Sequence, residues 1–231
     1  MNISSENKTV AVIIPCYNYA KYLGECIDSL LRQSRVPDEI IVVDDESPDN
    51  TKEVCEKYAH AGVKYIWQKN KGLSGSRNTG IKAAKSQYVM CLDADDMLKP
   101  DAIKEHLALV DENSIAQCGL MEFGATVGTF RPMGASIEIL RKTNTVYCNA
   151  MYPKSMWEKI GGYDESETMR LGWEDYEFWI RALKAGYKVN TSNYIALLYR
   201  RHASTMTKST THPNLPKIKA YMKGKHPDLW P

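Results

Sequence analysis

Short β-rich runs alternate with helical patterns over the first hundred residues, and this alternation limits the folds open to the chain. Leu23, Ile27 and Leu30 recur at helical spacing, which predicts an amphipathic helix over 21–32. Strands that alternate with helices form βαβ units, whose strands lie parallel. We therefore predict an α/β fold with a mostly parallel central sheet flanked by helices. The expected strands are Thr9–Ile14, Glu39–Val43, Val63–Trp67 and Tyr88–Leu92.

The second half of the chain is less regular, but no linker divides it into independent domains. Helices are expected at 154–160, closed by Gly161-Gly162, and at 174–185, with strands within 119–134 and 189–199. Hydrophobic residues make up 43% of the 231 residues, enough to build one substantial core. We expect a single domain followed by a basic tail.

Basic residues concentrate at the C-terminus. From Arg200 to Pro231 there are seven basic residues and one acidic residue, a net charge of +6 in a chain whose total is +2. Such a tail is either a solvated terminus or a contact for an anionic surface. The longest clean apolar run, Val10–Ile14, has five residues, too few for a membrane span or a signal segment. No two of the six cysteines lie closer than ten positions, which is typical of reduced thiols. We expect a cytoplasmic protein.

Acidic residues follow two of the expected strands. In open α/β sheets, ligands bind beyond the carboxyl ends of the strands, where this chain has Asp44-Asp45 and the run Asp93-Ala94-Asp95-Asp96. Carboxylates this close repel one another unless a cation or hydrogen-bond donors offset their charge, and hard oxygen ligands suit Mg²⁺ or Mn²⁺. The chain has no GxGxxG after the first strand and no GxxxxGK[ST] motif, which argues against dinucleotide-binding and P-loop folds.

Six short motifs occur in order between Thr9 and His202. They are Val12–Asn18, Ile41–Asp45, Gly72–Gly80, Leu92–Asp96, Gly161–Glu165 and Trp173–Trp179. In this order and spacing they resemble the family 2 glycosyltransferases. The resemblance implies the GT-A fold, a single domain with a nucleotide-binding N-terminal half and an acceptor-binding C-terminal half. We place this domain at 1–208, with a donor half of about 9–100, an acceptor half of about 101–208, and a basic tail at 209–231.

By similarity, six residues are expected to bind the donor. Pro15 and Tyr17 line the nucleoside site, with Tyr17 stacking on the base, and Asp45 with Arg77 meets the base edge. Asp93 and Asp95 match the DxD motif, in which the first carboxylate meets the ribose side and the second binds a Mn²⁺ or Mg²⁺ ion that holds the diphosphate.

Two further roles near the reacting groups follow from the resemblance. His202 lies where related enzymes place a contact to the metal or phosphate. Asp175 matches the catalytic base, and its place in the first turn of a helix predicts a lowered pKa that keeps the carboxylate ionised.

The acceptor side is expected to involve Trp173, Glu174 and Tyr152, because aromatic faces pack on sugar rings. The resemblance implies inverting, metal-dependent transfer from a nucleotide-sugar, most often a UDP-sugar, to a glycan or lipid-linked acceptor in surface glycan or polysaccharide biosynthesis. The QxxRW motif of processive synthases is missing, which favours addition of a single sugar.

Two alternatives remain open on the sequence alone. One is a sugar nucleotidyltransferase, and the other is a sugar-nucleotide or glycan-binding module without turnover. No nucleic-acid partner is expected, and the basic tail is a candidate for peripheral contact with the inner face of a membrane.

Overall fold

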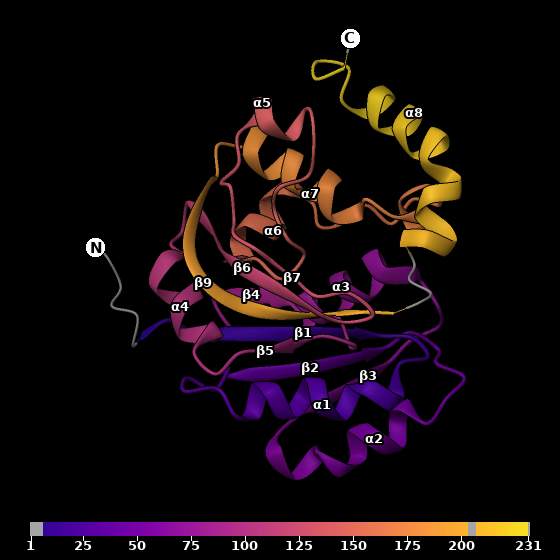
Figure 1. Ribbon diagram of the computed structural model, residues 1–231. Helices are drawn as coiled ribbons and strands as arrows, with labels where there is room; N and C mark the ends of the chain where they lie inside the picture. The colour runs from indigo at the N-terminus through magenta and orange to yellow at the C-terminus, as the bar shows by residue number, and fades with distance from the viewer. Residues whose placement is uncertain (1–6, 203–206, 231) are drawn as a thin grey trace.

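One nine-stranded sheet runs through the molecule (Figure 1). The computed structural model describes residues 7–202 and 207–230. The strand order is β3-β2-β1-β4-β8-β6-β9-β5, and β7 pairs with β6 outside this series. The strands are β1 (Val10–Cys16), β2 (Glu39–Asp44), β3 (Lys64–Trp67), β4 (Tyr88–Cys91), β5 (Met97–Leu98), β6 (Ser114–Gly124), β7 (Gly128–Phe130), β8 (Met151–Pro153) and β9 (Lys188–Arg201).

The sheet is parallel in its first half and mixed in its second. β1 pairs in parallel with β2 and β4, and β2 with β3, as the βαβ pattern predicts. Beyond β4, one pairing is parallel, that of β6 with β9. The others are antiparallel and join β4 to β8, β6 to β8, β6 to β7 and β5 to β9. The α/β class is confirmed, but the expectation of a mostly parallel sheet holds only for strands β1 to β4. Short connections such as the β6–β7 turn allow antiparallel pairing without a crossover helix.

Helices cover both faces of the sheet, and β1 contributes side chains to both cores. Val10, Val12 and Ile14 pack in one hydrophobic cluster and Ala11 and Ile13 in the other, which explains an uninterrupted apolar strand. Figure 1 shows α1 and α2 on one side of the sheet and α6 and α7 on the other. The helices are α1 (Ala20–Leu31), α2 (Thr51–Lys57), α3 (Gly72–Ala83), α4 (Ala102–Leu109), α5 (Ile137–Leu140), α6 (Lys154–Ile160), α7 (Glu174–Lys184) and α8 (Leu215–Lys225).

The basic tail folds onto the domain instead of extending into solvent. Ile218 and Met222 of α8, and Leu229 after it, are buried in the cluster that contains α7. Lys217, Lys219, Lys223 and Lys225 remain on the exposed surface of this helix. Among the helices in the described ranges, none is both long and apolar enough to cross a membrane.

Candidate functional site

The segments that follow β1, β2 and β4 meet at one edge of the sheet, where the sequence places its candidate residues. Asp45 N–H donates to the carbonyl of Cys16 at 2.9 Å, which joins the ends of β1 and β2. Two non-glycine residues of this edge, Asn18 and Glu46, have left-handed φ angles of 59° and 65°. Such conformations cost energy and often mark functional loops.

Asp45 holds the N-terminus of α3. Its buried carboxylate accepts the backbone N–H groups of Lys71 at 2.9 Å and Gly72 at 2.8 Å, and the Gln68 amide at 2.6 Å. Asp45 and Arg77 therefore contact different residues, although the sequence analysis expects both to meet the edge of the nucleoside base. Tyr17 is 50% exposed just beyond β1, whereas Pro15 is buried within that strand.

Arg77 is a buried cation that joins two carboxylates. Its side chain is 1% exposed and donates to Glu174 at 2.6 Å and to Asp93 at 3.1 Å. Burial by itself lowers the pKa of Arg77, but the charges of Asp93 and then Glu174 outweigh that effect and raise it well above its usual value. The guanidinium therefore stays charged and fixes the DxD segment relative to the start of α7.

Asp95 and His202, the two residues expected to bind a metal, lie side by side. His202 Nε2 is 2.9 Å from Asp95 Oδ2, and its Nδ1 is 3.2 Å from the Tyr22 hydroxyl. Burial, followed by the charge of Asp93, raises the pKa of the Asp95 carboxyl. The neighbouring Asp96 is 1% exposed, and its Oδ2 has no hydrogen-bond partner within the described residues.

These residues fit a metal ion that is completed by its substrate. Within 7–202 and 207–230, no group of three or more His, Cys, Asp or Glu residues is arranged to hold a metal. Mg²⁺ and similar ions, however, commonly bind one or two carboxylates and take their remaining ligands from phosphates and water. Asp95 and His202 match that incomplete protein ligand set, and the unpartnered Asp96 oxygen belongs to the residue next to Asp95.

Asp175 lies in the first turn of α7, immediately after Trp173 (φ 67°) and Glu174. Asn144 Nδ2 donates to its Oδ2 at 3.1 Å, and its own following amide, Tyr176 N–H, donates to Oδ1 at 2.7 Å. Burial, then repulsion by Glu174, raises its pKa to about 7. The expectation of a lowered pKa is therefore wrong, because desolvation and a neighbouring carboxylate outweigh the helix N-terminus.

The expected acceptor residues lie in three different environments. Tyr152 is fully buried, with its hydroxyl 3.1 Å from that of Tyr163, so its assignment to the acceptor platform is corrected to a core role. Its central position in β8 explains the burial, because this strand lies between β4 and β6. Glu174 is buried against Arg77, and Trp173 is half-buried with its ring edge-on to Tyr176 at 5.4 Å.

Three site residues carry no signal that sequence reasoning could use. Asn144 supports Asp175, Tyr22 contacts His202, and the Cys148 thiol donates to Asp93 Oδ2 at 3.7 Å. Each contact joins segments at least 31 residues apart, the longest spanning 180 residues. A local motif does not reveal pairs that only the finished fold brings together.

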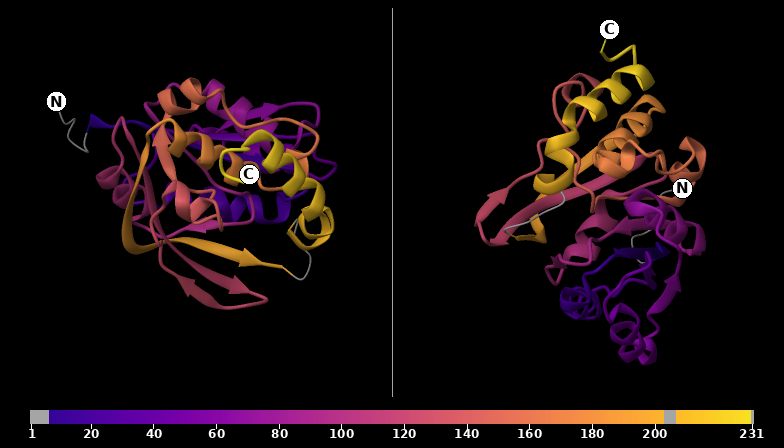
Figure 2. Two further views of the ribbon diagram at one scale, coloured as in Figure 1. Left: turned by 90° about the horizontal axis from the view of Figure 1, so that it is seen from above. Right: turned by 90° about the vertical axis from the view of Figure 1, so that its right-hand side faces the viewer.

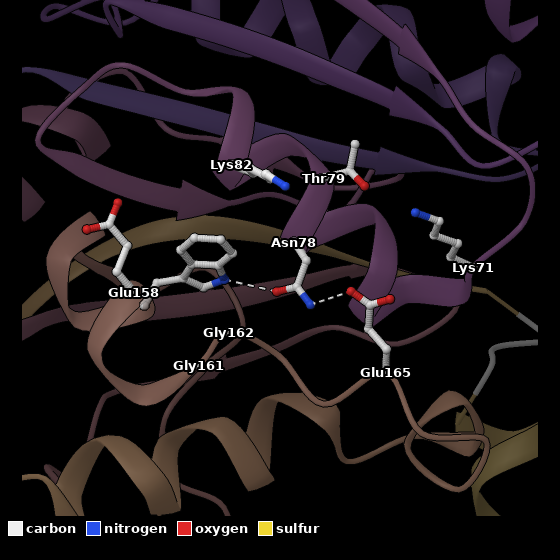
Figure 3. A pocket seen from close by; sticks show the side chains of 9 residues that line it. Lys71, Asn78, Thr79, Lys82, Glu158, Gly161, Gly162 and Glu165 are labelled. Carbon is white, nitrogen blue, oxygen red and sulfur yellow. Dashed lines mark hydrogen bonds between the residues drawn. The ribbon is translucent and has the colours of Figure 1, made fainter.

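A hollow of about 320 Å³ lies between α3 and the end of α6. Figure 3 shows Asn78 at its centre, with Glu165 on one side, and Asn78 Nδ2 donates to that carboxylate at 2.7 Å. Lys71, Lys82 and Glu158 also line the hollow. It contains none of the residues expected to bind donor, acceptor or metal, so its chemistry separates it from the candidate site.

The fold is that of the GT-A class of glycosyltransferases. The structure of S. aureus TarS 1-349 in complex with UDP-GlcNAc shares this fold with a TM-score of 0.73 and 22% identity, over 87% of this chain and 61% of that one. The model of Glycosyl transferase family 2 matches residues 11–167, and the chain belongs to that family.

Curated relatives agree with this membership. The uncharacterized glycosyltransferase EpsJ of Bacillus subtilis (strain 168) is 29% identical over 223 residues, which cover 88% of this chain and 64% of EpsJ. The chondroitin synthase of Escherichia coli is 40% identical over 97 residues, 41% of this chain and 14% of that protein. The chain thus spans a little under two thirds of the length of EpsJ.

Proposed function

We propose that the protein transfers a single sugar, with inversion, from a UDP-sugar to a hydroxyl of a glycan or lipid-linked acceptor in surface glycan or polysaccharide biosynthesis. The observation that carries the proposal is the bonded series Asp93–Arg77–Glu174, which ties the DxD segment to the helix turn that holds Asp175. A donor-side carboxylate and a candidate base are thereby fixed in one frame. The TarS structure is a complex with UDP-GlcNAc, which supports a uridine nucleotide-sugar as the first donor to test.

Asp175 suits the role of general base. A base works best when its pKa lies near the working pH, because it is then both ionised and basic enough to take a proton. With a pKa of about 7, Asp175 accepts the proton of the acceptor hydroxyl as that oxygen attacks the anomeric carbon. Asn144 holds Oδ2 in place, and Oδ1 is fixed by the backbone.

The leaving group is a nucleoside diphosphate, which needs no proton when its charge is offset. Asp95 and His202 would hold a Mn²⁺ or Mg²⁺ ion that supplies this positive charge. Because one base is enough for direct displacement, a second carboxylate acting as an acid is not required. Tyr17 is exposed where a nucleoside base would stack.

The exposed lysines of α8 give the tail its proposed role. We propose that Lys217, Lys219 and Lys223, which have no ion pair within the described residues, face an anionic membrane surface from the cytoplasmic side. A lipid-linked acceptor would be presented there.

The first experiment is thermal unfolding with UDP, GDP, CDP or TDP, each with and without Mn²⁺. We expect one nucleotide to raise the melting temperature only with metal, since ligand at ~100 times its Kd adds ~2.7 kcal/mol to folded-state stability. Asp95→Ala should abolish the shift, whereas Glu112→Ala, which removes an exposed carboxylate on another surface, should retain it. No shift with any nucleotide would contradict the proposed donor site.

Product analysis then separates the candidate activities. Transfer releases a nucleoside diphosphate and forms a glycoside with inverted anomeric configuration, which proton NMR of the product detects. A nucleotidyltransferase would release pyrophosphate instead. Binding without either product would favour a module without turnover.

A further inference from the structure

Exposed large apolar side chains gather on one segment of the chain. The described residues include seven large hydrophobic side chains that are exposed, and four of them lie between 127 and 139. These four are Val127 (83% exposed), Phe130 (48%), Met133 (73%) and Ile139 (36%). We call residues 127–142 the apolar segment. Isolated exposed apolar residues are ordinary, but a concentration of them marks an interaction surface.

The apolar segment also carries cations without partners. It contains Arg131, Arg141 and Lys142 against a single acid, Glu138, and all three cations are exposed. None of them forms an ion pair with any residue in the described ranges. Apolar side chains beside unpaired Arg and Lys form the pattern by which proteins lie on anionic bilayers.

The position of the segment links it to the candidate site. Figure 2 shows the β6–β7 hairpin, from which the segment begins, projecting from the body of the protein. At the other end of the segment, the carbonyl of Leu140 accepts the hydroxyl of Tyr176, the neighbour of Asp175. Trp230, beyond α8, donates to the carbonyl of Arg141 at 2.9 Å, so the basic tail ends against α5. The apolar segment, which is part of the acceptor half, and the tail therefore adjoin one another.

We propose that the apolar segment docks on an anionic lipid bilayer, with Val127, Phe130 and Met133 entering the interface and Arg141 and Lys142 facing the headgroups. The charge of the surface favours this occupant over a neutral glycan or an apolar protein face. Docking here brings the acceptor half to the lipid surface. This consequence rests on the proposed transfer to a lipid-linked acceptor, but membrane binding itself does not.

The test measures binding to vesicles by co-sedimentation, without donor or acceptor. Vesicles of phosphatidylcholine are compared with vesicles that also contain phosphatidylglycerol. We expect the wild-type chain to bind only the anionic vesicles. Arg141→Glu/Lys142→Glu should weaken that binding by at least about 25-fold, since the loss of each cation alone accounts for about five-fold. The triple variant V127S/F130S/M133S should weaken it at least about ten-fold through lost apolar burial.

Matched controls separate position from net charge. Lys52→Glu/Lys57→Glu makes the same change of charge on α2, which lies on the opposite side of the sheet from α6 and α7 (Figure 1). Val36→Ser removes an apolar side chain that is 42% exposed outside the segment. Both controls should bind within about two-fold of wild type, because their surfaces would not reach the headgroups.

Three outcomes would overturn the proposal. The first is a wild-type chain that does not bind anionic vesicles. The second is an equal loss of binding in Lys52→Glu/Lys57→Glu and Arg141→Glu/Lys142→Glu, which would indicate an effect of net charge alone. The third is a wild-type chain that self-associates without lipid while V127S/F130S/M133S stays monomeric, which would make the segment an interface between copies. Because no substrate is present, any of these results leaves the proposed glycosyl transfer untouched. Circular dichroism of each variant checks that it has folded.

Discussion

At the scale of single residues, Asp175 is expected to control the pH dependence of activity. Its pKa is raised to about 7 by burial and then by the charge of Glu174. Because the base must be ionised, we expect kcat/KM to fall below about pH 7 and to level off above it. Glu174→Gln removes the nearest repulsive charge, so the acidic limb should move to lower pH. A pH–rate profile of both proteins tests this, and an unmoved limb would contradict the assignment.

The same raised pKa predicts an effect on stability. When the pKa of a carboxyl is higher in the folded than in the unfolded protein, the folded state loses stability as the pH rises from about 4 to about 7. Asp175→Asn removes this penalty, so its melting temperature should exceed that of wild type at pH 8 and approach it at pH 4. Activity should fall by about 10²–10⁴-fold in the same variant, the usual contribution of a general base. Thermal scans at the two pH values and a transfer assay measure both effects.

Arg77 shows what a buried cation contributes. Replacing it with alanine leaves Glu174 and Asp93 without their shared partner, and such a loss typically costs about 3–5 kcal/mol. Denaturant unfolding measures this loss. Arg32→Ala, which removes a mostly exposed arginine paired at 3.6 Å with Asp28, should change the free energy of unfolding by less than about 1 kcal/mol. Equal losses would mean that Arg77 does not hold a stabilising bridge.

At the scale of elements, α8 depends on a buried carboxylate of α7. Glu177 is fully buried and bonded to Arg181, Lys225 and His226. Burial raises the pKa of Glu177, but hydrogen bonds from His226 and Arg181 outweigh this effect and lower it to about 2. A depressed carboxyl pKa gives stability that is present above about pH 4.5 and is lost as the pH falls toward 2.

We therefore expect α8 to loosen in that acid range. Trp230 reports the change, because its indole bonds to Arg141 and its ring packs edge-on to Tyr176. Glu177→Gln should already show at pH 7 the change in tryptophan fluorescence that marks a loosened tail. Glu56→Gln, an exposed change on α2, should behave as wild type. A tail signal that does not respond to acid would contradict this account.

The elements also show what sequence can predict. Strong periodicity located α1 and α7 to within one residue of their observed starts, because tertiary contacts reinforce a pattern that is already local. β5 and β8 have two and three residues, too few for any periodicity. In α8, the run of lysines concealed Ile218 and Met222, whose burial depends on a partner surface elsewhere in the chain.

The candidate site follows the same division. Position along the motifs anticipated that Asp95 and His202 would meet, and the structure places them in contact. It did not anticipate the burial of Tyr152 or the raised pKa of Asp175, since both depend on how much solvent the finished fold removes. The types and order of residues can be read from a sequence, whereas the desolvation of a side chain depends on the whole folded chain.

At the scale of the whole molecule, the contact between His202 and Asp95 spans 107 residues. Most donor-side residues lie in the first hundred positions, yet this contact forms only once β9 has been added to the sheet. During synthesis, the chain must therefore be made at least as far as His202 before these two side chains can meet. Under the proposed metal dependence, a nascent fragment that ends before His202 would lack one of the two metal-binding side chains, so it would not act on a sugar donor.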